Sequence, residues 1–183
     1  MNTPASSLPD LSRLRGVVAA EILAAAEVAS LMLREAGVPH ALAGGLAVGA
    51  YGYPRTTDDV DFLVGDEAFV RHAGNLITLK VPLIAVGNVR IDMVPIGSSP
   101  EEKEQLRPAI ESAPESERIP IVPLTALVYM KLKASRQKDL ADLVELLKRG
   151  RIDIDGIDRY LEQHAPAYRR QWARVKEMAA KEE

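Results

Sequence analysis

The segment Asp59–Val64 reads Asp-Val-Asp-Phe-Leu-Val and places two acids at alternate positions of an apolar run. This alternation, with its β-branched and aromatic residues, predicts a strand. Residues two apart in a strand point to one face, so Asp59 and Asp61 project together while the apolar side chains face the other way. Adjacent carboxylates repel each other, and a divalent cation bound between them removes that conflict. The segment therefore predicts a sheet strand that carries either a Mg²⁺ site or a solvated acidic face.

A third acid lies in the later apolar segment 89–94, which reads Val-Arg-Ile-Asp-Met-Val. Its alternation places Arg90 and Asp92 on one face and the apolar residues on the other. If this strand lies beside the first, Asp92 joins Asp59 and Asp61. Three carboxylates can hold two metal ions about 3.5–4 Å apart, the arrangement used for in-line phosphoryl displacement. An unpaired acid within an apolar strand is costly, which favours a metal site over a solvated face.

Two consecutive glycines, Gly44 and Gly45, lie between a short extended segment at 40–43 and a short helix expected at 46–51. Glycines at such a turn let the backbone approach a ligand, and a helix N-terminus offers free N–H groups to phosphate. The alternative is a plain tight turn.

Residues 41–64, from Ala-Leu-Ala-Gly-Gly to Arg-Thr-Thr-Asp-Asp-Val-Asp-Phe-Leu-Val, resemble the nucleotidyltransferase superfamily, especially its AbiEii-type and related small bacterial members. That pattern is a glycine turn, a helix and an Arg-x-Thr-x-Asp-x-Asp run that enters a strand. Here Arg55, Thr57, Asp59 and Asp61 match the run. The resemblance implies that Asp59 and Asp61 bind metal, that the glycine pair holds a triphosphate, and that Asp92 is the third carboxylate. Thr57, as a match to the run, is expected in the nucleotide site. Arg55 either contacts the phosphates there or counters the charge of Asp58, and its place beside the metal strand favours the first.

A second block, residues 127–143, is similar to the helix pair found downstream in AbiEii-like proteins. In that pattern a lysine on the first helix reaches the nucleotide, and Lys131 matches it. From chemistry alone, a lysine such as Lys131 is more often a solvated helix lysine than a phosphate ligand. Lys138 and Asp142 are spaced i,i+4, which is typical of a surface ion pair. The resemblance covers residues 38–147.

The order of predicted elements indicates one α+β domain with a helical C-terminal part. The resemblance implies the polymerase-beta-like nucleotidyltransferase fold, a mixed sheet flanked by helices. We expect a flexible tail at 1–10, an α/β core at 11–122 and a helical region packed on it at 123–183. The expected helices are 11–36, 65–73, 140–147, 154–164 and 167–181, with a further helix that Pro123 opens. The expected strands are 59–64, 76–86, 89–96 and 119–122, with a Gly87-Asn88 hairpin. Residues 98–117 are a loop or a short helix.

Composition excludes several classes of chemistry. The 183 residues contain no cysteine, which excludes disulfides, thiolate metal sites and cysteine nucleophiles. The most apolar stretch, 17–33, carries Glu21 and Glu27, so it predicts a helix in water and no membrane span. The first residues lack a basic region followed by an apolar run, which predicts a cytoplasmic protein.

The formal net charge of −3 means that any nucleic-acid partner must use a local basic patch. The last helix offers one, with Arg169, Arg170, Arg174 and Lys176 around Tyr168 and Trp172. It is either a patch for an RNA acceptor or a terminal helix with its aromatic side chain docked and its charges in water. The acidic balance favours the second interpretation.

The sequence therefore predicts an enzyme that uses Mg²⁺ or Mn²⁺ to move a nucleoside monophosphate from a nucleoside triphosphate to an acceptor hydroxyl. The acceptor could be tRNA or another RNA, a protein or a small molecule. A toxin–antitoxin or phage-defence setting, with an antitoxin as partner, follows from the resemblance. The alternative is a non-catalytic nucleotide-binding or regulatory protein that keeps the fold, because fold does not determine function.

Overall fold

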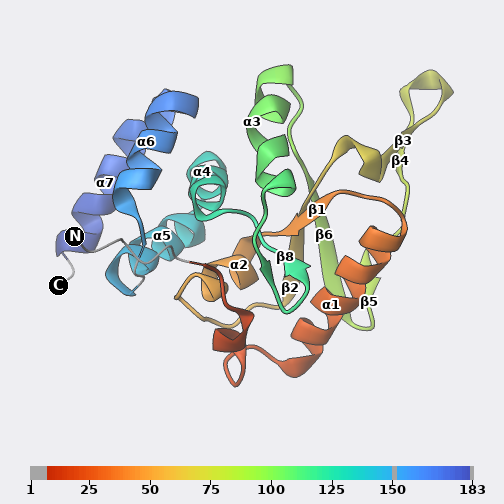
Figure 1. The fold of residues 1–183 in the computed structure, drawn as a ribbon, viewed down its shortest axis with the longest axis horizontal. Helices are drawn as coiled ribbons and strands as arrows, with labels where there is room; N and C mark the ends of the chain where they lie inside the picture. The colour runs from red at the N-terminus through yellow and green to blue at the C-terminus, as the bar shows by residue number, and fades with distance from the viewer. Residues whose placement is uncertain (1–7, 150–151, 182–183) are drawn as a thin grey trace.

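The computed structural model describes residues 8–149 and 152–181, which form an α+β fold (Figure 1). The strands are β1 (His40–Leu42), β2 (Asp59–Val64), β3 (Phe69–Arg71), β4 (Ile77–Leu79), β5 (Ala85–Val86), β6 (Val89–Pro95), β7 (Glu115–Ser116) and β8 (Ile119–Pro120). The α-helices are α1 (Ala20–Glu35), α2 (Gly44–Ala50), α3 (Pro100–Glu111), α4 (Leu124–Ala134), α5 (Gln137–Arg149), α6 (Ile154–His164) and α7 (Arg169–Lys181). Short 3₁₀ helices are η1 (Leu11–Leu14), η2 (Asp66–Ala68), η3 (Ala73–Asn75) and η4 (Pro166–Tyr168). The predicted α+β class is confirmed.

The main sheet is mixed and places its strands in the order β1-β2-β6-β5. Strands β2 and β6 are parallel, and their register sets Asp61 opposite Asp92. Strand β1 pairs antiparallel with β2, and β5 pairs antiparallel with β6 through the expected Gly87-Asn88 turn. Gly87 has a φ of 58°, a conformation that glycine adopts without steric cost. The predicted adjacency of the two acid-bearing strands is therefore confirmed.

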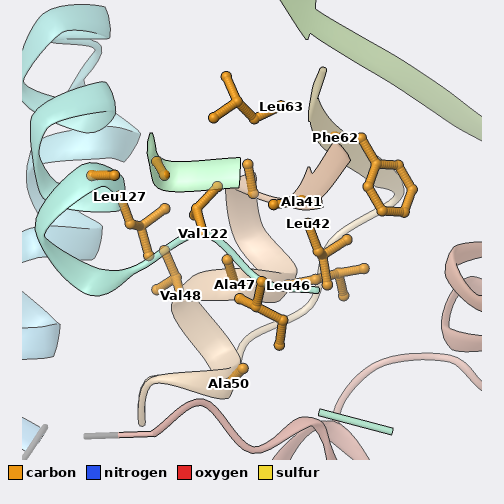
Figure 2. Packing of buried hydrophobic residues seen from close by; sticks show 14 of the residues in the cluster. Ala41, Leu42, Leu46, Ala47, Val48, Ala50, Phe62, Leu63, Val122 and Leu127 are labelled. Carbon is orange, nitrogen blue, oxygen red and sulfur yellow. The ribbon is translucent and has the colours of Figure 1, made fainter. Parts of the chain in front are cut away.

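The core that supports these strands is mostly aliphatic. Figure 2 shows Leu42 of β1, Leu46 of α2 and Phe62 of β2 packed together, with Val122 and Leu127 from the next connection and α4 beside them. All are almost completely buried. Phe62 lies on one face of β2 and the two acids lie on the other, because side chains alternate. Leu63, on the face of the acids, is also buried in this core.

The C-terminal third is helical, as predicted. Helices α5, α6 and α7 lie at the end of the molecule opposite α1 (Figure 1). Helix α7 buries Trp172, Val175 and Ala179, and it packs on α5. Among the described helices, none is both long and apolar enough to cross a membrane.

Three local predictions are wrong, each because tertiary packing or one residue interrupts the pattern. The single helix expected at 11–36 is broken, since Gly16 has a φ of 79° and Leu14 is buried. The helix expected at 65–73 is only the turn η2, and its chain continues as β3, which pairs with β4. The strand expected at 76–86 is divided into β4 and β5 around Pro82, which has no N–H for a sheet.

The N-terminal tail predicted for 1–10 lies mostly outside the described residues. Its last residue, Asp10, caps η1 by accepting a hydrogen bond from the Ser12 N–H, and its own N–H donates to the carbonyl of Ala50. The segment 98–117, left open between loop and helix, forms α3 and β7. Ser99 caps α3 by accepting a hydrogen bond from the Glu102 N–H, as serine commonly does.

Candidate metal and phosphate site

Three carboxylates meet on the acidic face of the β2–β6 pair. One oxygen from each of Asp59, Asp61 and Asp92 lies within 4.8 Å of the others. The two acids of β2 share a face because they are two residues apart, and the parallel register places Asp92 directly beside Asp61. The exposed fraction of the side chain is 28% for Asp59 and 42% for Asp92. The structure thus brings together all three predicted metal ligands.

The three carboxylates differ in their partners. Asp59 accepts a hydrogen bond of 2.8 Å from the Thr57 hydroxyl at one oxygen and one of 2.8 Å from Arg90 at the other. Asp92 lies 2.9 Å from the same guanidinium nitrogen of Arg90. Among the described residues, no hydrogen bond or ion pair reaches the carboxylate of Asp61. The group therefore carries more negative charge than its contacts neutralise.

The pKa values follow this difference. Burial, then the charges of Asp59 and Asp92, raise the pKa of Asp61 to about 6. Burial also acts to raise the pKa of Asp59, but the Thr57 hydrogen bond and the nearby charges of Arg90 and Lys138 outweigh it, so that pKa lies below its ordinary value. A raised carboxyl pKa beside other acids is typical of a functional site, although ion-pair networks also shift pKa values.

The glycine turn touches this group directly. Gly44 has a φ of 60°, and a Cβ atom placed on it would collide with Oδ2 of Asp61. A Cβ on Gly45 would lie 3.1 Å from the Thr57 hydroxyl and 3.3 Å from the Arg55 guanidinium. The backbone at the start of α2 can approach the carboxylates this closely because neither residue has a side chain. Both predicted glycines therefore border the group.

Lys131 and Arg55 belong to an ion-pair network around the buried carboxylates of Asp139 and Asp142. The Lys131 ammonium donates to Asp139 at 3.0 Å and to Asp142 at 2.7 Å. Arg55 donates two hydrogen bonds to Asp142, at 2.6 and 2.8 Å. Arg136 donates to Asp139 at 2.6 Å. The network joins α4 and α5 to the segment that precedes β2.

Two interpretations of this region are wrong. Lys131 is not a solvated helix lysine, because it is 6% exposed. Lys138 and Asp142 are not a surface pair, because Asp142 is 1% exposed and is bonded to Arg55 and Lys131. The sequence reasoning assigned no role to Asp139. Its signal was present as a second acid one helical turn before Asp142, facing the same side of α5.

Exposed cations lie near the carboxylate group. Arg90 is 65% exposed and Arg136 is 77% exposed along the side chain. A hydrogen bond to Asp139, together with the charges of Asp139, Asp61 and Asp59, raises the pKa of Arg136. Lys138 is exposed and close enough to lower the pKa of Asp59. Sequence reasoning placed Arg90 on the acidic face but assigned it no role; its signal was the two-residue spacing from Asp92.

The remaining sequence candidates have structural roles. His40 is buried between the carbonyl of Val38 and the hydroxyl of Ser30, each 2.8 Å from a ring nitrogen. Trp172 is 2% exposed and donates its indole N–H to Asp158. The interpretation of the last helix as one with a docked aromatic side chain is confirmed.

No protein-family model matches the chain, and a search of curated proteins returns no match.

Proposed function

We propose that this chain is a metal-dependent nucleotidyltransferase with the nucleotidyltransferase fold. The observation that carries the proposal is the convergence of Asp59, Asp61 and Asp92 from two neighbouring parallel strands, with oxygens within 4.8 Å. The site would transfer a nucleoside monophosphate from a nucleoside triphosphate to an acceptor hydroxyl on RNA, protein or a small molecule.

The carboxylates fit a divalent cation by their chemistry. Mg²⁺ and Mn²⁺ favour hard oxygen ligands, and Mg²⁺ is commonly held by one or two carboxylates together with substrate phosphates. Asp61 is mostly buried and has no partner among the described residues, so it offers free lone pairs toward the other two acids. A bound cation would polarise the α-phosphate and neutralise charge on the leaving pyrophosphate. Thr57 holds Asp59 in place through its hydrogen bond.

The phosphates would bind between the glycine turn and the start of α5. Gly44 and Gly45 leave room for phosphate oxygens close to the backbone. Lys138 is an exposed cation near the carboxylates and can reach a triphosphate without breaking a buried contact. Arg136 is also exposed, but it donates to buried Asp139 and would have to share or give up that bond. Lys131 is bound to two buried aspartates, so we assign it, together with Arg55, to positioning the turn and α5. Asp92, the most exposed acid, would orient or deprotonate the acceptor hydroxyl.

The alternative is a non-catalytic nucleotide-binding or regulatory partner that keeps the fold, for example beside an antitoxin. The presence of all three acids favours chemistry, because loss of one acid would have been sufficient to remove it. The uncompensated charge of Asp61 points the same way, since a purely structural cluster gains stability from balanced charges.

The test compares label transfer by two neighbouring acid variants. Purified protein is incubated with Mg²⁺, each of the four α-labelled nucleoside triphosphates and a cell lysate. We expect the wild type and Asp58→Asn to transfer label to a macromolecule or metabolite, and Asp61→Asn to transfer none. Asp58 is an exposed acid outside the group, so it matches the chemical change without touching the site. Equal labelling by Asp61→Asn would contradict the proposed mechanism, and binding of triphosphate without transfer would favour the alternative.

A further inference from the structure

The guanidinium of Arg90 lies between Asp59 and Asp92, where a metal ion bound by both carboxylates would lie. One of its nitrogens is 2.8 Å from Oδ2 of Asp59 and 2.9 Å from Oδ2 of Asp92. A single nitrogen of this cationic group therefore bridges two of the three carboxylates. Asp61, the third, is left without a partner among the described residues. A cation that binds all three oxygens would compete with Arg90 for two of them.

Strand pairing explains how Arg90 reaches this place. Arg90 is the register partner of Asp59 across the β2–β6 pair, and it shares a face with Asp92 two residues later. Neighbouring positions on a sheet face allow opposite charges to meet. Its side chain is 65% exposed, so it can turn outward without leaving a buried position. Exposed ion pairs of this kind are weak, which makes them easy to exchange.

We propose, on the basis of the nucleotidyltransferase function above, that Arg90 is a resident counter-ion that exchanges partners during substrate loading. Without metal, it neutralises Asp59 and Asp92. When a divalent cation binds the carboxylates, Arg90 turns outward and its guanidinium binds phosphate oxygens of the incoming triphosphate. The planar guanidinium fork matches phosphate geometry as well as it matches carboxylate geometry.

The proposed exchange predicts that removal of Arg90 has opposite effects on the affinity for a metal ion alone and on the affinity for metal–nucleotide. Removal of Arg90 frees Asp59 and Asp92, so a metal ion alone binds more tightly. The same removal deprives the triphosphate of a contact, so metal–nucleotide binds more weakly. An arginine that only supports the fold would weaken both.

The experiment measures Mn²⁺ binding without nucleotide, by the electron paramagnetic resonance signal of free Mn²⁺. The proteins are wild type, Arg90→Ala, Lys138→Ala and Asp61→Asn. We expect Arg90→Ala to bind Mn²⁺ about three- to tenfold more tightly than wild type. Lys138→Ala removes a nearby charge without a contact to the carboxylates, so it measures the through-space effect and should change affinity by less than about twofold. Arg90→Gln, with a similar stem and no charge, repeats the test if the alanine variant folds poorly.

A second measurement titrates α,β-methylene analogues of the four triphosphates in the presence of Mg²⁺, by calorimetry. We expect Arg90→Ala to lower the affinity for the preferred analogue about tenfold. Tighter Mn²⁺ binding with unchanged analogue binding would overturn the exchange.

The outcomes separate this proposal from the proposed function. If wild type binds Mn²⁺, Asp61→Asn does not, and Arg90→Ala equals wild type or Lys138→Ala, Arg90 is no counter-ion to the metal while the metal site stands. If neither wild type nor Arg90→Ala binds Mn²⁺, the exchange is wrong, and the label-transfer assay decides the proposed function by itself.

Discussion

Two clusters of aspartates lie near each other in this molecule and differ in charge balance. In the buried cluster, Asp139 and Asp142 are bonded to three cations, Arg55, Lys131 and Arg136. The open cluster consists of Asp59, Asp61 and Asp92. Among the described residues, its ion pairs are those of Arg90 with Asp59 and Asp92.

The pKa values record the difference. Burial acts to raise the pKa of both Asp139 and Asp142, but their hydrogen bonds and cation partners hold both pKa values below the ordinary range. In the open cluster, burial and two neighbouring acids raise the pKa of Asp61 to about 6. The balanced cluster holds its charges in pairs, whereas we propose that the unbalanced cluster binds a cation that the chain does not supply. The following predictions test this contrast.

The largest effect on stability should come from breaking the balanced cluster. Asp142→Ala leaves Lys131 and Arg55 buried without their shared carboxylate, and removal of one partner from a buried pair costs about 3–5 kcal/mol. Urea denaturation measures the free energy of unfolding. Asp58→Ala, at an exposed acid, is the control and should change it by less than about 0.5 kcal/mol. A loss as small as that of the control would mean that the network contributes little to stability.

The open cluster should respond to metal where the buried one does not. At a Mg²⁺ or Mn²⁺ concentration of about 100 times Kd, a single site stabilises the folded state by about 2.7 kcal/mol. We expect a rise in Tm of the wild type on addition of metal, and no rise for Asp61→Asn. Chelation with EDTA should reverse the shift. An equal rise in both proteins would place the bound metal elsewhere.

Substitution of Asp61 should stabilise the metal-free protein, opposite in sign to substitution of Asp142. Because the folded pKa of Asp61 is raised to about 6, its ionised form carries a penalty that is complete above that pH and fades as pH falls toward the unfolded value near 4. Asp61→Asn removes the penalty, so in EDTA at pH 8 it should raise the free energy of unfolding by on the order of 2 kcal/mol. The gain should shrink between pH 6 and pH 4. Urea denaturation at several pH values measures it, and a gain independent of pH would contradict this origin.

The smallest effect tests the close approach of the glycine turn to the open cluster. Gly44→Ala introduces a Cβ in a left-handed conformation and against Asp61, whereas Gly37→Ala introduces one at a φ of 64° with no atom nearby. Both should lose about 1 kcal/mol from backbone strain. Gly44→Ala should lose more, and it alone should weaken Mn²⁺ binding because it displaces the Asp61 carboxylate. Identical behaviour of the two variants would remove the role assigned to Gly44.

The sequence predicted the elements whose pattern is local and uninterrupted. The helices at the C-terminal end, the strand 59–64 and the Gly87-Asn88 hairpin follow from periodicity and turn residues alone. The helix expected at 65–73 was wrong because two acids at its start favour a helical turn, while Phe69 and its neighbours instead pair with β4. The break in the expected helix 11–36 falls at Gly16, which the sequence shows, but it also depended on the packing of Leu14 against α2, which no local pattern records.

The sequence by itself determined that Asp59 and Asp61 share one face, because side chains in a strand alternate with a period of two. It also determined that Gly44 and Gly45 leave the adjacent backbone open. Tertiary structure alone decided that β6 lies parallel beside β2, which brings Asp92 and Arg90 to those acids across 31 residues. It decided equally that Arg55 meets Asp142 across 87 residues. Local pattern fixes the direction of a side chain, but its partners depend on strand register and helix packing, which the whole core sets together.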